Sequence, residues 1–334
     1  MDEVIEIIRN LKKGIIHPVY FLMGDEPYYI DIISDYIESS ILTEEERGFN
    51  QMTLYGLDVS IEDVVSNAKR FPMMAEHQVI IVKEAQALSR NIEKLKDYAE
   101  NPQPSTALVI CYKGKTLDKR KALYKALKKT GVVYTSKKVP DYKLADWIHR
   151  ALTSKGYSIE PKAVQMLADF LGNDLGRVSQ ELEKLKVIIS KEQQITAALV
   201  EKNIGISKDF NNFELREAIG ERNKVKAHQI VNYFGENPKA HPMVVTVAMI
   251  YSFFSQLLQY HGLQDKSKGS VASALRINPF FVKDYALAAR NYPMKRISQI
   301  ISLLRETDLK GKGLGATNIG QGQLLKELLI KIMD

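Results

Sequence analysis

The pattern of hydrophobic and polar positions changes near residue 140. Before this point, short apolar runs of strand length alternate with amphipathic stretches that have the period of a helix. The runs QVIIV and ALVICY are apolar throughout, which is typical of strands buried on both faces of a parallel sheet. The predicted strands are residues 19–23, 52–55, 78–82, 107–112 and 132–135. Strands that alternate with helices predict an α/β layer with a mostly parallel sheet.

Three amphipathic helices are predicted between these strands. They cover residues 27–39, 61–70 and 119–129. Ser60 and Asp63 have the spacing of a capping box at the start of the second of these helices. Pro72 ends the same helix, because proline cannot continue the hydrogen-bond ladder.

Only helical patterns follow residue 140, and a polar break at residues 207–209 divides them. The predicted helices are residues 141–153, 161–171, 174–189, 197–203, 213–219, 225–234, 244–260, 279–289, 297–309 and 324–333. We therefore expect an α/β domain of residues 1–140 and two helical domains, residues 141–207 and 208–334. The glycine-rich segment Gly311–Gly322 follows a helix rather than a strand, which favours a surface loop over a phosphate site.

The composition is that of a globular protein. Hydrophobic residues make up 45% and charged residues 26% of the 334 positions, which argues against disorder. No apolar run approaches the roughly 20 residues of a membrane span, and the N-terminus does not have the pattern of a signal peptide. The single cysteine, Cys111, lies in an apolar run, so we expect a buried thiol in a reducing compartment. These features favour a cytoplasmic protein with no membrane partner.

The net charge of +7 is unevenly distributed. Residues 113–138 contain ten basic residues and one acid, Asp118. A basic patch raises the local concentration of polyanions such as DNA, so Lys119, Arg120, Lys121 and Lys125 are candidate DNA-binding residues. A solvated helix face would have the same pattern, and charge alone does not separate the two interpretations.

The segment Gly24-Asp25-Glu26-Pro27 lies where the first strand turns into a helix, the position of the phosphate cradle in many nucleotide-binding proteins. A P-loop requires several glycines, a lysine for the phosphates and a hydroxyl for magnesium. This loop has one glycine, no lysine and two acids that suit the positive end of the helix. Lys83 follows the third strand, where an ATPase of this architecture would place an aspartate to hold magnesium. We therefore expect no cofactor and no ATP hydrolysis.

No other catalytic or metal-binding pattern was found in the sequence. The six histidines have no ligand spacing, and the motifs HExxH, CxxC and G-x-S-x-G do not occur. Acids on predicted helices, such as Glu181 and Glu183, are expected to be solvated or paired. We expect no metal site and no catalytic residue.

Four consecutive apolar residues lie between a predicted helix and the third strand: Phe71, Pro72, Met73 and Met74. Large apolar side chains in a turn that contains proline are not all expected to face inward. Burying one such side chain is worth roughly 1.5–3 kcal/mol, so two or three of them can anchor a protein partner. The alternative is that one or both methionines pack beneath the strand and that Phe71 belongs to the core.

Five segments of the chain, in order, resemble a known family. The most specific is LADFLGNDLGRVSQELEKL, residues 167–185, with a leucine-rich helix, a G-N-D-L turn and an E-L-E-K-L helix. The others are VYFLMGDEPYYI, KTLDKRKALYKAL, FELREAIGERNKVKAHQIV and LLRETDLKGKG. Over nearly its whole length the chain resembles the delta subunit of the bacterial DNA polymerase III clamp loader.

The resemblance implies an AAA+-like α/β domain with a degenerate P-loop, a small helical lid domain and a helical collar domain for oligomerisation. It implies a subunit without intrinsic activity that binds and opens the sliding clamp (beta), so that the clamp is loaded on primed DNA during replication. The implied partners are the ATPase subunits (gamma or tau), the delta prime subunit and primer–template DNA. Polymerase activity would belong to the holoenzyme, and ATP would be bound by neighbouring subunits.

The resemblance also assigns a role to the apolar turn. The family inserts a hydrophobic pair from this element, commonly leucine followed by phenylalanine, into a pocket on the clamp. Met73 and Met74 take those positions, with Phe71 and Pro72 beside them. Met74 departs from the family pattern because it has no aromatic ring.

Two alternatives to the clamp-loader interpretation follow from the same residues. One is a degenerate AAA+ scaffold or a DNA-binding subunit of another assembly, which failure to bind any sliding clamp would favour. The other is an active NTPase with an unusual loop, which nucleotide assays test directly.

Overall fold

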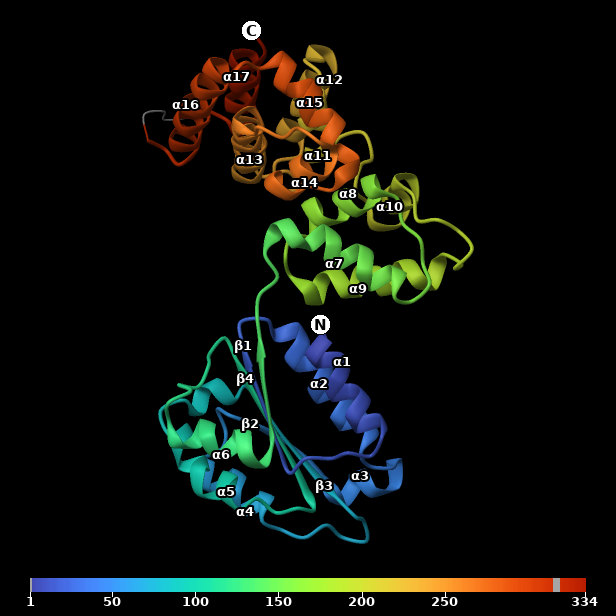
Figure 1. Cartoon of the computed structure of the whole chain (residues 1–334), viewed down its shortest axis with the longest axis vertical. Coiled ribbons are helices and arrows are strands. Elements are labelled where there is room, and N and C mark those ends of the chain that lie inside the picture. The colour runs from blue at the N-terminus through green and yellow to red at the C-terminus, as the bar shows by residue number, and fades with distance from the viewer. Residues whose placement is uncertain (1, 315–318) are drawn as a thin grey trace. The chain divides into compact units, whose positions relative to one another are not determined.

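The computed structural model describes residues 2–314 and 319–334. Its internal contacts divide the chain into two compact units, Met1–Val139 and Pro140–Asp334. In Figure 1 the first unit contains the sheet, and the second, coloured from green to red, is helical. The finer division of the helical part at residue 207 remains a prediction. Of the glycine-rich segment Gly311–Gly322, residues 315–318 lie outside the described part of the chain.

The first unit is built on a five-stranded sheet in which every strand pair is parallel. All five predicted strands are present in this sheet. Its strands, in spatial order, are β2 (Gln51–Tyr55), β3 (Gln78–Lys83), β4 (Thr106–Lys113), β1 (Val19–Gly24) and β5 (Val132–Ser136). Because β1, β3 and β4 lie inside the sheet and are covered on both faces, nearly every residue in them is buried. Strand β2 forms one edge, and all its positions are half-buried or exposed.

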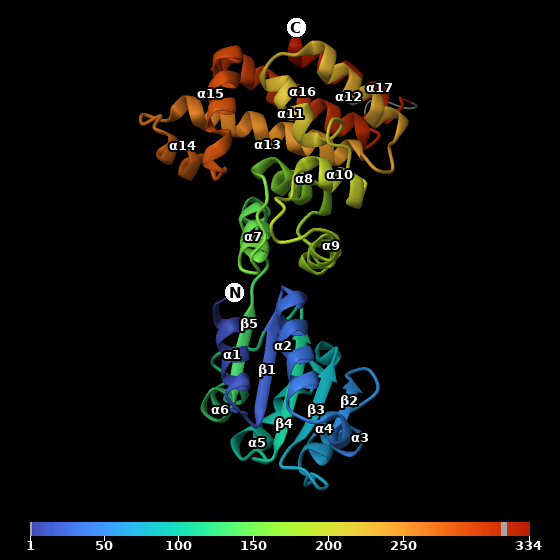
Figure 2. The ribbon, with the colours of Figure 1, turned by 90° about the vertical axis from the view of Figure 1, so that its right-hand side faces the viewer.

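Helices cover both faces of the sheet, as Figures 1 and 2 show. On one face lie α1 (Asp2–Lys12) and α2 (Pro27–Ser40), and on the other α4 (Ile61–Ala68), α5 (Lys96–Glu100) and α6 (Ala122–Thr130). Two short 3₁₀ helices, Ala85–Leu88 and Ile92–Leu95, and the helix α3 (Glu44–Asn50) complete the unit. Helix α1 and the short elements α3, α5 and the 3₁₀ helices were not predicted.

Helix α6 begins three residues later than its pattern predicts. The backbone N–H of Lys121 donates to the Asp118 carbonyl over 3.1 Å, which closes a turn before the helix. Lys119 and Arg120 therefore lie in this turn, and only Lys125 of the four candidate DNA-binding residues lies within the helix.

The second unit consists of helices packed around one continuous apolar cluster from Phe213 to Met333 and a smaller set of buried residues before it. Every predicted helix of this region is present, and α14 had no clear pattern in the sequence. The helices are α7 (Asp141–Thr153), α8 (Pro161–Leu171), α9 (Leu175–Ile188), α10 (Ala197–Ile204), α11 (Asn212–Gly220), α12 (Lys224–Glu236), α13 (Met243–Gly262), α14 (Lys268–Leu275), α15 (Val282–Asn291), α16 (Met294–Gly311) and α17 (Gln321–Met333), with a 3₁₀ turn at Pro279–Phe281.

Helix α13 corrects one expectation. The sequence was expected to contain no apolar run of membrane-spanning length, yet α13 is long and apolar enough to pass that test by length and composition. Its buried side chains, including Phe253, Phe254 and Leu257, belong to the apolar cluster of the second unit. A core helix of a globular domain passes the same test, so α13 is accounted for by its packing.

The buried carboxylate of Glu214 ties α8 to α11 and α12. Its side chain is 3% exposed and forms ion pairs with Lys162 of α8, at 2.5 Å, and with Lys226 of α12. Burial lowers the pKa of Lys226, but the hydrogen bond and the charge of Glu214 outweigh this effect and hold that pKa above its usual value. Because a buried carboxylate needs paired cations, this cluster fixes the packing of the three helices.

Cys111 is buried in β4, as the sequence predicts, and burial raises the pKa of its thiol to about 12. Since the thiolate is the reactive form, we expect the native protein at pH 8 not to react with a disulfide reagent such as DTNB. Unfolding in guanidinium chloride should release one reactive thiol per chain. Rapid stoichiometric labelling of the native protein would contradict the burial of this side chain.

Candidate functional site

The predicted apolar contact residues, Phe71 to Met74, lie in the turn between α4 and β3, and most of them are highly exposed. Phe71 is 78% exposed, Met73 63% and Met74 104%, whereas Pro72 is half-buried. The alternative that the methionines pack beneath the strand is therefore wrong, and Phe71 is not part of the core. Three large apolar side chains that face solvent within four residues form a surface that could dock a protein. We call residues 71–74 the apolar turn.

Asn50, the last residue of α3, holds the apolar turn in place. Its side-chain Oδ1 accepts the backbone N–H of Met73 over 2.6 Å, and its Nδ2 donates to the Met73 carbonyl over 2.9 Å. Nδ2 also donates to the Glu46 carbonyl over 3.1 Å within the same helix. Since Asn50 is only 4% exposed, this amide satisfies backbone groups that would otherwise lack partners at the edge of the sheet.

Buried hydrogen bonds also fix the end of α4, where the chain enters the apolar turn. The Nε2 of Gln78 donates to the Arg70 carbonyl over 2.5 Å and to the Thr106 hydroxyl over 2.8 Å. Thr106 in turn donates to the Ala68 carbonyl over 2.9 Å. The last carbonyls of α4 are therefore capped by side chains of β3 and β4, which define where the turn begins.

Met74 has a left-handed backbone, with φ of 54°. A residue with a Cβ pays about 1–2 kcal/mol for this conformation. Met74 follows Met73, whose backbone is bonded to Asn50, and lies four residues before the start of β3. Backbone strain of this kind is concentrated at functional sites, which supports a functional role for the turn.

Phe49 is a further exposed aromatic residue beside the turn. It precedes Asn50 in α3 and is 77% exposed. Since Asn50 bonds directly to Met73, Phe49 lies at the same corner of the sheet as the apolar turn. The sequence reasoning missed both residues, although the capping box of Thr43 and Glu46 marks the start of α3.

The loop at the end of β1 has its backbone amides engaged by the protein. The N–H of Gly24 donates to the Lys115 carbonyl over 3.0 Å, and those of Asp25 and Glu26 donate to the carbonyl and hydroxyl of Ser136 over 3.3 and 3.1 Å. Gly24 has φ of 120°, and a Cβ there would lie 2.1 Å from the Ser136 carbonyl oxygen. Strand β5 thus packs directly against this loop.

One of the two acids of this loop, Glu26, serves the helix that follows, as the sequence predicts. Glu26 is the N-cap of α2 and accepts the N–H of Tyr28 over 3.3 Å, and Pro27 occupies the first turn. A carboxylate at this position stabilises the positive end of the helix.

The lysines at the carboxyl ends of β3 and β4 form ion pairs with acids of α2. Lys83 lies 3.3 Å from Glu38, and Lys113 lies 2.8 Å from Asp31 and 3.6 Å from Glu84. Burial lowers the pKa of Lys83, but the hydrogen bond and charge of Glu38 outweigh it and hold this pKa above its usual value. These charges fasten α2 to the sheet where an ATPase would hold magnesium. Among the described residues, no group of three histidine, cysteine or acidic side chains is placed to bind a metal.

The four candidate DNA-binding residues are exposed, but two of them pair with acids. Arg120 binds Asp118 through several hydrogen bonds, the shortest 2.8 Å, and Lys121 lies 3.4 Å from Glu93. No carboxylate of residues 2–314 or 319–334 lies within 4 Å of Lys119 or Lys125. The basic stretch is therefore less positive at its centre than its sequence suggests.

The fold and the family comparisons agree on the class of this protein. Residues 20–137 match the sequence model of the family described as DNA polymerase III, delta subunit, and residues 209–332 match the C-terminal domain of the same family. The two matches together cover more than two thirds of the chain. The chain belongs to the DNA polymerase III delta-subunit family.

A sequence and a solved structure, both from Bacillus subtilis, are similar to the chain over nearly its full length. DNA polymerase III subunit delta of strain 168 is 27% identical, over 98% of this chain and 96% of its own. The solved structure described as the Bacillus subtilis DNA clamp loader delta protein is 26% identical, with a TM-score of 0.55 and 99% of both chains covered. The sequence resemblance to this family is thereby confirmed.

The role of Asn50 in holding the apolar turn can be measured by mutation. We expect Asn50→Ala to lower the free energy of unfolding by about 1–3 kcal/mol, because it leaves the backbone of Met73 without two buried partners. The amide of Met73 should also exchange faster with solvent. Equilibrium denaturation and hydrogen exchange report the two effects.

Asn67→Ala is the matched control for this substitution. Asn67 is a half-buried residue of α4 whose side chain donates only within its own helix, to the Asp63 carbonyl. Its loss should change stability by less than about 0.5 kcal/mol. Equal effects of the two substitutions would show that Asn50 does not hold the turn.

Proposed function

We propose that this chain is the clamp-loader subunit that binds and opens the sliding clamp, so that the clamp can be loaded on primed DNA. Membership of the DNA polymerase III delta-subunit family supports this function. The full-length similarity to a solved DNA clamp loader delta protein supports it as well. The single observation that carries the proposal is the exposed apolar turn, since Phe71, Met73 and Met74 face solvent on a fixed backbone.

The apolar turn would dock into a pocket on the clamp. Each methionine that becomes buried there contributes roughly 1.5–3 kcal/mol. A preorganised backbone reduces the entropy lost on binding, which the hydrogen bonds from Asn50 to Met73 favour. Phe49, exposed at the same corner, extends the contact surface. Flexible methionine side chains can adapt to the pocket in place of the aromatic ring that is common in this family.

The chain would act without hydrolysing ATP itself. A degenerate P-loop is supported by the amides of Asp25 and Glu26, which donate to Ser136, and by the ion pairs of Lys83 and Lys113 with α2. In this account the nucleotide-binding architecture serves as a scaffold in an assembly whose other subunits, gamma or tau, bind ATP. The helices after residue 208 would join these subunits and delta prime as a collar.

Primer–template DNA is a further proposed partner. Lys119 and Lys125 are exposed and have no nearby carboxylate in the described chain, so they are the better candidates of the basic stretch. Arg120 and Lys121 would first have to exchange Asp118 and Glu93 for phosphate. A cytoplasmic location follows from this role in replication.

Binding to the sliding clamp of the same organism tests the proposal. Surface plasmon resonance should detect binding of the isolated chain, and the double substitution Met73→Asp, Met74→Asp should weaken it by about 100-fold or more. This loss corresponds to the burial of two methionines, since each 1.4 kcal/mol changes affinity tenfold. Because both side chains are exposed, the free energy of unfolding should change little.

Leu57→Asp is the matched control for the clamp experiment. Leu57 is 83% exposed and follows the carboxyl end of β2, whereas the apolar turn precedes the amino end of β3. The control should therefore bind like the wild type. Binding that survives the double substitution would move the contact away from the apolar turn. If the wild type fails to bind, alone and with its ATPase partners, a subunit of another assembly is favoured.

ATP hydrolysis tests the proposal that the chain has no activity of its own. With magnesium and ATP, we expect phosphate release no faster than in buffer, since the loop Gly24–Pro27 has no lysine and its amides are engaged. Hydrolysis that follows the chain through two purification columns at constant specific activity would contradict this and favour an active NTPase.

A further inference from the structure

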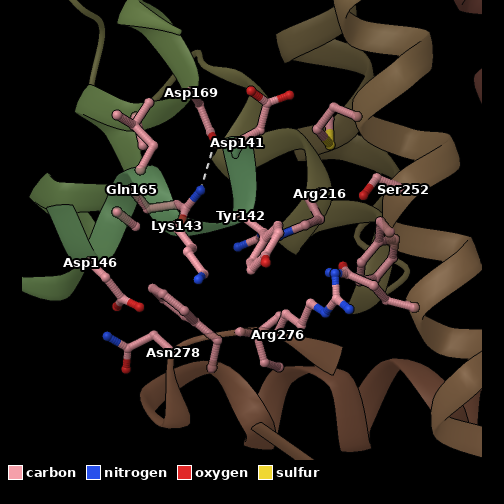
Figure 3. A pocket seen from close by; sticks show the side chains of 18 of the residues that line it. Asp141, Tyr142, Lys143, Asp146, Gln165, Asp169, Arg216, Ser252, Arg276 and Asn278 are labelled. Carbon is pink, nitrogen blue, oxygen red and sulfur yellow. Dashed lines mark hydrogen bonds between the residues drawn. The ribbon is translucent and has the colours of Figure 1, made fainter. Parts of the chain in front are cut away.

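A large cleft opens within the second unit, between α7 and α8 on one side and α11 and α13–α15 on the other. Its volume is about 940 Å³, at the upper end of the range of ligand pockets. Figure 3 shows polar side chains that enter it from both sides, among them Lys143 and Asp169 from the first pair of helices and Arg216 and Arg276 from the second group. Neither the clamp contact nor the loop at β1 uses this cleft.

The hydrogen-bond acceptors that line the cleft are mostly engaged by their neighbours. Asp169 accepts the side-chain amide of Gln165 over 2.7 Å, and Asp141 accepts that of Asn173 over 2.6 Å. The side-chain oxygen of Asn278 accepts the N–H of Phe280 over 2.9 Å.

Two further side-chain oxygens of the cleft, those of Gln256 and Asn212, are also engaged as acceptors. The side-chain oxygen of Gln256 accepts the hydroxyl of Tyr285 over 2.6 Å, and its Nε2 donates to the Leu275 carbonyl. The side-chain oxygen of Asn212 accepts the hydroxyl of Thr246 over 3.1 Å. Among the acids of the cleft, only Asp146, at the exposed rim, has no hydrogen bond to its carboxylate from the described residues.

Several hydrogen-bond donors of the cleft, in contrast, have no acceptor among the described residues. The guanidinium of Arg216 stacks on the ring of Phe213, at 4.7 Å from its centroid, and that of Arg276 stacks on Tyr142 at the same distance. No carboxylate of the described residues lies within 4 Å of either guanidinium. The amide nitrogen of Asn278 and the hydroxyl of Ser252 also have no acceptor among the described residues.

The formal charges of the cleft are balanced, with three acids and three bases (Asp141, Asp146, Asp169, Lys143, Arg216 and Arg276), but the two arginines are left without a carboxylate partner. Burial is the largest effect on Asp169 and raises the pKa of its carboxyl, while the charge of Arg216 opposes that shift. The carboxyl group of Asp169 is therefore harder to ionise than that of an ordinary aspartate. A half-buried arginine without a carboxylate partner is best matched by an anion, because its planar fork donates to phosphate or carboxylate in pairs.

We propose that this cleft binds a small polyanion, whose phosphate or carboxylate groups pair with Arg216 and Arg276. An acceptor-rich ligand satisfies the donors that the protein leaves unpaired, and the aromatic rings of Phe213 and Tyr142 support the two guanidinium groups from behind. This site is independent of the apolar turn, which belongs to the first unit.

Isothermal titration calorimetry on the full chain at low ionic strength tests this proposal, with sodium pyrophosphate and sodium citrate titrated separately. At least one of them should bind saturably. Arg216→Gln and Arg276→Gln should each weaken that binding by at least about tenfold, as expected for the loss of charge-assisted hydrogen bonds. Binding of pyrophosphate alone identifies a phosphate ligand, binding of citrate alone a carboxylate ligand, and binding of both the anion chemistry that they share.

Arg305→Gln provides the matched control. Arg305 is exposed on α16 outside the cleft, and its substitution removes the same net charge. Arg276 is also exposed, so its single substitution keeps the test valid even if Arg216→Gln reduces stability. The proposal is overturned if the wild type binds neither anion, if binding survives in folded cleft variants, or if Arg305→Gln weakens it equally. Clamp binding by the cleft variants should stay unchanged, which separates this site from the apolar turn.

Discussion

The hydrogen bonds between the side-chain amide of Asn50 and the backbone of Met73 are the interaction on which the proposed docking surface depends. An exposed apolar segment without such support would collapse onto the sheet or remain mobile, and either outcome would weaken binding. Here a nearly buried amide from α3 satisfies both the N–H and the carbonyl of Met73. The backbone is thereby held at the edge of the sheet while the side chains of Phe71, Met73 and Met74 remain in solvent. In the proposed function, the backbone hydrogen bonds stabilise the turn and the exposed side chains supply the binding affinity.

Backbone groups at the opposite ends of the strands are likewise hydrogen-bonded within the protein. In a nucleotide-binding loop, free amides point toward phosphate. In this chain the amides after β1 donate to Lys115 and Ser136, and the lysines after β3 and β4 pair with carboxylates of α2. These amides and lysines contribute to the packing of the first unit. In the proposed function, the five-stranded sheet is a frame that carries the apolar turn.

The sequence predicted the strands and most helices because their hydrophobic periods are long and regular. It located the apolar turn through Phe71–Met74, since proline and large apolar residues between a helix and a strand are rarely all buried. It did not predict α3, whose seven residues are too short for a clear period, and so it missed Asn50 and Phe49. Nor could it show that Arg120 and Lys121 pair with Asp118 and Glu93, because the second pair joins residues far apart in the chain. The polar cleft of the second unit likewise depends on contacts between helices that no local pattern encodes.

Hydrogen–deuterium exchange of the chain with and without its sliding clamp tests the central claim most directly. The account predicts that the clamp protects the segments that contain residues 49–52 and 71–78, because Phe49 and the apolar turn become buried together. It predicts no change in the loop of residues 24–27, whose amides are already bonded within the protein. Protection elsewhere, with the apolar turn unchanged in the presence of saturating clamp, would contradict the account.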